Sequence, residues 1–122
     1  MNKKRTVLIV EDDEAIRKSL KECFEREGFL VTEAINGFEA ETYLRQETPD
    51  YLLLEIVSPD KDRIEMILDL KHAGTNVFVM SGSSGCLRFA EKLGADAVLL
   101  KPFDLTYLNE LISLLILLKN IG

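Results

Sequence analysis

Five side chains with acid, hydroxyl or amine groups come at the ends of apolar, strand-like runs in this chain. They are two adjacent acids, a single acid, a hydroxyl and an amine: Glu11, Asp12, Glu55, Ser81 and Lys101. The carboxyl ends of parallel strands lie along one edge of a sheet, so these side chains are expected to meet there. Three carboxylates in one place repel one another unless a positive charge lies among them. A hard divalent cation with oxygen ligands, such as Mg²⁺, suits that position.

The same edge offers groups for an anion. Lys101 supplies a second positive charge, and Ser81 with the Gly82 backbone can hold an anion's oxygens. Together with a cation, these groups predict a site for a metal ion and a phosphoryl group. The alternative is that an acid after a strand only caps the next helix, and for Glu11 or Asp12 alone the two readings are about equally good. The acid pair, the central acid, the hydroxyl and the lysine taken together favour the metal and phosphoryl site over simple helix capping.

Strand-like and helix-like segments alternate along the whole chain and must position these residues. We expect strands at residues 6–10, 29–34, 51–56, 77–80 and 97–100, and helices at 14–27, 38–45, around 64–71, at 86–93 and at 105–119. Glycines follow several of these helices, as is typical of helix ends, and Asn36-Gly37 indicates a turn. Five strand–helix units predict a parallel sheet with helices on both faces, joined by right-handed crossovers.

Composition narrows the class of protein. A chain of 122 residues fits one domain, and its net charge of −6 and pI near 4.8 argue against a nucleic-acid-binding surface. The apolar run VLIV near the N-terminus is too short for a signal peptide, and no run is long enough to span a membrane. Cys23 and Cys86 lack CxxC spacing and are expected to be reduced thiols of a cytosolic protein.

Four segments, VLIVEDDEAIR, LLLEIVSPDKD, VFVMSGS and GADAVLLKPF, resemble those of response-regulator receiver domains of two-component signalling. The resemblance covers nearly all of residues 4–119. It implies a flavodoxin-like (βα)₅ fold with strand order 2-1-3-4-5 and a histidine kinase or another signalling protein as partner. We expect residues 1–122 to be a single cytoplasmic receiver domain without an effector domain, because the chain ends with the fifth helix.

The resemblance assigns metal ligands. Glu11 and Asp12 match the metal-binding acid pair of receivers, and the backbone carbonyl of Val57 matches a further ligand. Glu55 lies in the same ligand set. The implied metal is Mg²⁺.

The resemblance also assigns phosphoryl-contacting residues. Ser81 matches the hydroxyl residue, Lys101 matches the phosphate-contacting lysine, and Glu55 stands at the phospho-acceptor position. Lys101-Pro102 matches a peptide bond that is often cis in this family, and cis bonds are essentially confined to X-Pro.

Glu55 departs from the family pattern, because the phospho-accepting residue is an aspartate there. Glutamate has the same charge but one more methylene, and a displacement of about 1 Å can cost on the order of 10²-fold in rate. The longer side chain can instead reach Lys101 or the metal and partly imitate the phosphorylated state. We therefore expect Glu55 to be a non-acceptor.

Three further departures indicate an atypical receiver. Val98 stands where many receivers have a switch tyrosine or phenylalanine, which turns inward when the hydroxyl residue contacts phosphate. Without an aromatic side chain there, this conformational coupling is expected to be absent. The spacing from Ser81 to Lys101 is about two residues shorter than the family resemblance implies, which predicts a shortened loop or fourth helix. Arg63 stands where receivers usually have glycine, so a changed turn is expected if that glycine has a positive φ.

The last helix is apolar around most of its surface. One set of residues suffices to cover the sheet: Leu108, Leu111 or Ile112, Leu115 and Leu118. Leu114, Ile116 and Leu117 then remain, which favours a homodimer or a partner surface, unless a few leucines are simply exposed.

Three hypotheses follow. The first is a receiver that acts as a protein-interaction module, held in one signalling state by Glu55 and not itself an enzyme. The second is a receiver that catalyses its own Mg²⁺-dependent phosphorylation, on Glu55 or on an aspartate that Glu55 has replaced naturally or by engineering. The third, a flavodoxin-like small-molecule binder, is disfavoured because EDDE, and no glycine-rich phosphate loop, follows the first strand.

Overall fold

The structure, a computed structural model, describes residues 4–121, and within them all side chains except Leu115 and those of residues 118–121. Its five strands are β1 (Thr6–Val10), β2 (Leu30–Ala34), β3 (Tyr51–Glu55), β4 (Asn76–Ser81) and β5 (Ala97–Leu100). Its five helices are α1 (Glu14–Arg26), α2 (Gly37–Leu44), α3 (Lys61–His72), α4 (Ser84–Lys92) and α5 (Leu105–Ile121). Every predicted strand and helix is present.

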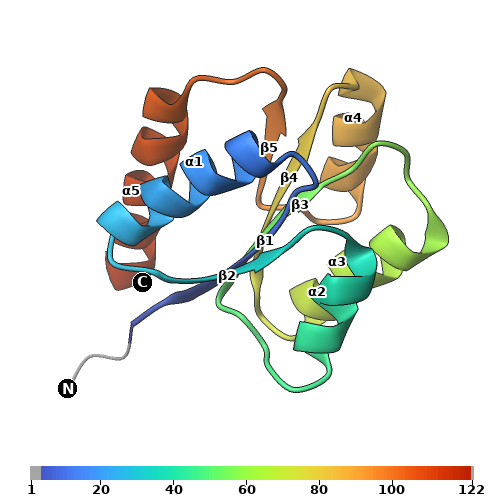
Figure 1. The fold of residues 1–122 in the computed structure, drawn as a ribbon, viewed down its shortest axis with the longest axis horizontal. Helices are drawn as coiled ribbons and strands as arrows, with labels where there is room; N and C mark the ends of the chain where they lie inside the picture. The colour runs from blue at the N-terminus through green and yellow to red at the C-terminus, as the bar shows by residue number, and fades with distance from the viewer. Residues whose placement is uncertain (1–3, 122) are drawn as a thin grey trace.

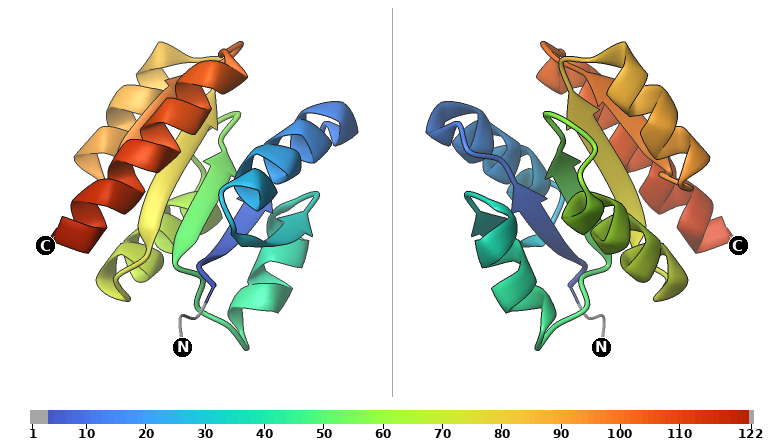
Figure 2. Two further views of the ribbon diagram at one scale, coloured as in Figure 1. Left: turned by 90° about the vertical axis from the view of Figure 1, so that its left-hand side faces the viewer. Right: turned by 90° about the vertical axis from the view of Figure 1, so that its right-hand side faces the viewer.

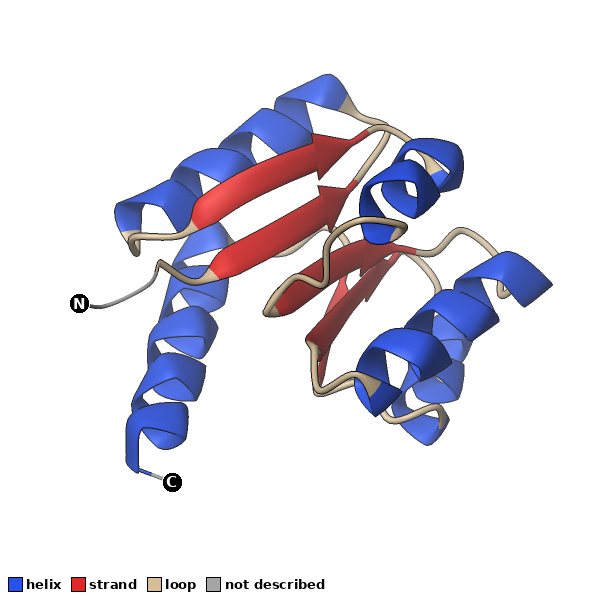
Figure 3. Ribbon diagram, turned by 90° about the horizontal axis from the view of Figure 1, so that it is seen from below, coloured by secondary structure: helices blue, strands red, loops and turns tan. Residues whose placement is uncertain are grey.

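The strands form one parallel sheet in the order β2-β1-β3-β4-β5, which confirms the predicted flavodoxin-like topology (Figure 1). One core cluster joins the sheet to α1 and α5, and a second joins its other face to α2, α3 and α4. Figures 2 and 3 show the sheet between these two groups of helices. Residues 51–54 of β3 are buried, because β3 is the central strand and is covered on both faces.

Polar side chains start four of the helices. The side chains of the N-cap residues Asp13, Asn36, Asp60 and Ser83 each accept a hydrogen bond from a backbone N–H in the first turn. The expected turn at Asn36-Gly37 is therefore the capped start of α2. Helices α3 and α4 begin before their first apolar residues, because capped polar first turns carry no apolar periodicity.

Glycines end α1, α3 and α4, as the sequence indicates. Gly28, Gly74 and Gly94 have φ values of 88°, 92° and 101°, in the left-handed region that residues with a Cβ disfavour. The Lys101-Pro102 bond is cis, as the family resemblance implies. At the start of the last helix, the Asp104 side chain accepts a hydrogen bond from the Thr106 N–H, as an N-cap residue does.

The prediction of reduced cysteines can be checked directly. Cys23 and Cys86 are free and buried, so no disulfide joins them. Met66 and Met80 lie in the core and His72 is exposed. Among the described residues, no helix has both the length and the apolar character needed to cross a bilayer.

The last helix is apolar on more than its sheet-facing side. Leu108 and Ile112 are buried against the sheet, and Leu111 is half-buried. Leu114 and Leu117 are 51% and 56% exposed, and Ile116 is half-buried. The predicted contribution of Leu115 and Leu118 to the core falls on side chains outside the described set. The exposed leucines agree with the expected excess of apolar surface.

Candidate functional site

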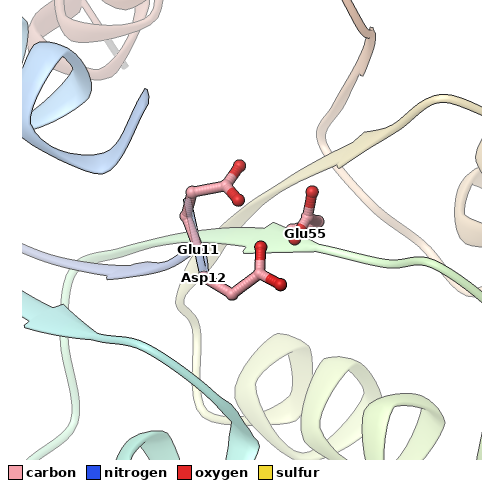
Figure 4. A group of neighbouring side chains, drawn as sticks. All are labelled: Glu11, Asp12 and Glu55. Atoms are coloured by element: carbon pink, nitrogen blue, oxygen red, sulfur yellow. The ribbon is translucent and has the colours of Figure 1, made fainter. Parts of the chain in front are cut away.

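The three predicted carboxylates meet at the carboxyl ends of β1 and β3. These strands are adjacent and parallel, with Val10 opposite Leu54, so Glu11 and Glu55 reach the same edge of the sheet. Asp12 follows directly. One carboxylate oxygen from each of Glu11, Asp12 and Glu55 lies within 4.8 Å of the others, and Figure 4 shows the three side chains converging.

Lys101 supplies the positive charge that this cluster needs. Its Nζ atom donates a hydrogen bond to Glu11 Oε1 at 2.6 Å and another to Glu55 Oε2. The Lys101 and Glu55 side chains are 18% and 17% exposed, and that of Glu11 is fully buried. The longer side chain of Glu55 does reach Lys101, as predicted.

Glu11 is fixed by both its side chain and its backbone. Its Oε2 atom accepts a hydrogen bond from the Asp13 N–H at 3.1 Å, and its carbonyl accepts one from Arg17 Nη1 at 2.9 Å. The buried Arg17 also donates from Nε to Glu33 Oε1 at 3.1 Å. Sequence reasoning missed Arg17, although it precedes Leu20 and Phe24 at the i, i+3, i+7 spacing of a buried helix face.

The shared environment shifts the pKa values of the cluster in different directions. Burial raises the pKa of Glu11 above its ordinary value, although Lys101 opposes this effect. Hydrogen bonding with the Glu11 and Glu55 carboxyls lowers the pKa of Asp12. Burial disfavours the charge on Lys101, but its bonds to the two glutamates outweigh this and raise its pKa. Lys101 is therefore a fixed cation at neutral pH.

The acids line a cleft of about 190 Å³, together with Val57, Asp60 and Arg63. The Val57 carbonyl accepts a weak hydrogen bond from Cys86 Sγ at 3.7 Å. Its position on the cleft agrees with the predicted role of a ligand carbonyl, which stays a prediction. The Val57 side chain is exposed.

Arg63 does not require the changed turn that we expected. It lies in the first turn of α3, where its N–H donates to Asp60 Oδ1 at 2.8 Å, and among residues 4–121 only glycines have a positive φ. Instead, its guanidinium lies over Gly37, where an added Cβ would clash with Nη1. The arginine is therefore accommodated by the absence of a side chain at residue 37.

Ser81 lies beside Lys101 but makes different contacts. It is buried at the end of β4, and its carbonyl accepts the Lys101 backbone N–H at 2.8 Å. Its Oγ atom accepts the Ser83 N–H at 3.1 Å. Contact of this hydroxyl with a phosphoryl group stays a prediction. Val98 is half-buried in β5 and packs on the α2–α4 side of the sheet.

The donor set fits a hard divalent cation. Three carboxylates supply oxygen atoms, which are the ligands that Mg²⁺ prefers. Each Glu11 oxygen already accepts one hydrogen bond, but a carboxylate oxygen has a second acceptor position that can take a metal. Bound Mg²⁺ would supply positive charge to oxygens of a transferring phosphoryl group.

Comparison with known proteins agrees with this geometry. Residues 7–113 match the sequence profile of the response regulator receiver domain. The chain belongs to the response regulator receiver family. It is a receiver domain of two-component signalling.

Two relatives of this receiver are similar over nearly their whole length. It is 34% identical over 113 residues to the chemotaxis protein CheY of Halobacterium salinarum, covering 89% of this chain and 94% of the relative. It is 32% identical over 124 residues to sporulation initiation phosphotransferase F of Bacillus subtilis, covering 98% of both chains. A CheY-like receiver domain protein from Methanospirillum hungatei has a similar crystal structure, with a TM-score of 0.78 and 30% identity over 91% of this chain and 92% of that one.

Proposed function

We propose that this receiver is a protein-interaction module whose signalling state is set by Glu55 and not by an aspartyl phosphate. The observation that carries the proposal is the ion pair between Glu55 and Lys101. The lysine that would otherwise contact a phosphoryl group is already bound by a carboxylate of residue 55. Glu55 thereby places negative charge near the position that a phosphoryl group would occupy.

The extra methylene of Glu55 also disfavours phosphorylation. In-line attack needs the nucleophilic oxygen at a defined distance from phosphorus, and a displacement of about 1 Å costs on the order of 10²-fold in rate. Apart from Mg²⁺-dependent reaction at its own residue 55, we propose no enzymatic activity. A cytoplasmic location, where a signalling partner would be met, belongs to the same proposal.

A second function is a receiver that accepts a phosphoryl group on Glu55. The acid pair and Lys101 favour it, because they lie beside Glu55 with oxygen ligands and a positive charge that a phosphoryl transfer needs. The two functions differ in one measurable property, the reactivity of residue 55.

Intact mass after incubation with acetyl phosphate and Mg²⁺ separates them. We expect wild-type protein to keep its mass and the Glu55→Asp variant to gain one phosphoryl group. A Lys101→Met change in the Glu55→Asp background is expected to reduce labelling. Labelling of the wild-type protein at Glu55 would overturn the proposal, whereas a failure of both proteins to react would mean that the site no longer supports phosphoryl transfer.

Mg²⁺ binding is tested separately by thermal unfolding. A ligand that binds only the folded state at ten times its Kd stabilises that state by about 1.4 kcal/mol. We therefore expect Mg²⁺ to raise Tm by a few degrees in the wild type, and an Asp12→Asn variant to lose most of this rise. An equal rise in both proteins would place the ion elsewhere.

Two apolar surfaces can serve the interaction. One is a groove of about 530 Å³ between α1 and the loop that carries Lys101, lined largely by apolar residues such as Ile16 and Phe103. A histidine kinase or another signalling protein could dock there, beside the site. The other is the outer side of α5, where the exposed Leu114 and Leu117 and the half-buried Ile116 favour a homodimer. Sedimentation of the wild type against a Leu114→Ser/Leu117→Ser variant tests the dimer.

A further inference from the structure

A groove of about 370 Å³ lies between α2 and α3, on a surface that the proposed function does not use. Helix α2 packs on β1 and β2, whereas α3 packs on β4. Strand β3 lies between these strands, so α2 and α3 are neighbours on one face of the sheet (Figure 1). Neither α1 nor α5, on the other face, contributes to this groove.

The floor of the α2–α3 groove is apolar. Leu44 of α2 is half-buried, and Met66 and Leu70 of α3 are 5% and 7% exposed. These residues belong to or pack against the core cluster that also contains Leu52 and Leu54 of β3. The floor is therefore the outer edge of the core, where a partner's apolar side chains can contact Leu44 and the exposed parts of Met66 and Leu70.

The walls of the groove are acidic. Glu41 of α2 faces Asp62, Glu65 and Asp69 of α3, and Arg45 is the one cation among the lining residues. Among the described residues, these acids make one ion pair, between Glu65 and the exposed Lys61 at 3.8 Å. The spacing of the α3 acids, i, i+3 and i+7, places them in one stripe about 10 Å long.

The stability of α3 does not account for this stripe. Like charges three or four residues apart destabilise a helix by roughly 0.2–0.5 kcal/mol per pair. Asp69 also lies near the C-terminal end of α3, where the helix dipole disfavours a negative charge. Only Asp62, in the first turn, is favourably placed. The stripe would be stabilised by positive charges supplied from outside.

We propose that the α2–α3 groove binds a basic, amphipathic helix of a partner protein. The helix would place apolar residues on Leu44, Met66 and Leu70 and lysines or arginines against the acids. Charge decides the class of partner: nucleic acids and anionic membranes would be repelled by the acidic walls. A second copy of this chain is disfavoured as the occupant of this groove, because its net charge of −6 offers no basic helix to the acidic walls.

Titration of the ¹⁵N-labelled full chain with a synthetic peptide tests the proposal by NMR. The probe has about 14 residues, roughly four helical turns, with leucines on one face and lysines beside them. We expect shift changes confined to α2 and α3. An Asp62→Asn/Glu65→Gln/Asp69→Asn variant is expected to bind about tenfold more weakly, because it loses three charge pairs with the peptide. These acids are exposed, so the variant should fold normally.

Two controls make the result specific. A Glu22→Gln/Glu25→Gln/Glu27→Gln variant removes the same charge from an exposed acidic part of α1 and its end, and should bind within about twofold of the wild type. A peptide with serines in place of its leucines should not bind, because it cannot contact the floor. Equal weakening by both triple variants, undiminished binding of the serine peptide, or shifts spread over the whole surface would overturn the proposal. None of these readouts depends on residue 55.

Discussion

Two groups of acidic side chains lie on this receiver, one in the cleft at the strand ends and one along the α2–α3 groove. The cleft acids Glu11 and Glu55 are bound by Lys101 within the protein. The groove acids face Arg45 but make one described ion pair, to Lys61, at a largely exposed position. Lys101 thus balances negative charge of the first group within the protein. The negative charge of the second group is balanced mainly by solvent ions or by a partner.

Burial explains this difference. A charge removed from water costs several kcal/mol unless another charge and hydrogen bonds replace the lost solvation, so the buried Glu11 needs Lys101. An exposed carboxylate keeps its water and needs no partner inside the chain. A compensated cluster therefore indicates a site built into the fold, and an uncompensated one indicates a surface that can attract charge from outside.

The largest change in stability is expected from replacing Lys101, the cation inside the cleft. Lys101→Met keeps most of the apolar side chain but leaves the cleft carboxylates uncompensated, and should lower the free energy of unfolding by about 2 kcal/mol. Lys71→Met is the matched control, because Lys71 forms a more exposed ion pair with Asp96 at 2.8 Å, and it should cost less than about 1 kcal/mol. Urea denaturation measures both. Equal losses would contradict the proposed role of burial.

A change of intermediate size is expected in how the cleft acids make the free energy of unfolding depend on pH. The pKa of Glu11 is raised by burial, so its stabilising contribution is present below its unfolded pKa of about 4.5 and is lost as pH rises through the folded pKa. The stability of Glu11→Gln relative to wild type should therefore improve between about pH 3 and pH 7. This is measured as the free energy of unfolding at both pH values.

Asp12→Asn provides the control of opposite sign. Hydrogen bonding with Glu11 and Glu55 lowers the pKa of Asp12, so its contribution is present above the unfolded value of about 3.8 and is lost as pH falls through the folded pKa. The Asp12→Asn change should therefore lower the free energy of unfolding more at pH 7 than at pH 3. If both variants changed with pH in the same direction, the assigned roles of burial and hydrogen bonding would be wrong.

The smallest effects are expected in the groove. Asp62→Asn should lower stability by a few tenths of a kcal/mol, because it removes a negative charge from the first turn of α3. Asp69→Asn should raise stability by a similar amount, because it relieves repulsion from Glu65 and the unfavourable helix dipole. Chemical denaturation in low salt measures both. A loss above about 1 kcal/mol for either variant would show that the groove acids are compensated within the fold after all.

The sequence patterns were sufficient for the ten elements and the parallel sheet, the family resemblance supplied the strand order, and together they predicted most of the cleft. Apolar runs alternating with helical periodicity predicted all ten elements, and their parallel order places Glu11, Asp12 and Glu55 at one edge. This works because strand ends in a parallel sheet meet whatever the side-chain packing. Helix starts were predicted less well, since α3 and α4 begin with polar, capped turns.

Beyond the predicted contact of Glu55 with Lys101, only the tertiary structure decided which long side chains meet. The sequence does not reveal that Arg63 lies over Gly37, or that the buried Arg17 holds the Glu11 carbonyl. Nor does it reveal that Glu41 and the acids of α3 share a groove. Local patterns specify helices and strands because they depend on neighbouring residues, whereas these contacts depend on how separate helices pack on the sheet. The strand order brings the acids together, and side-chain packing determines which cation reaches them.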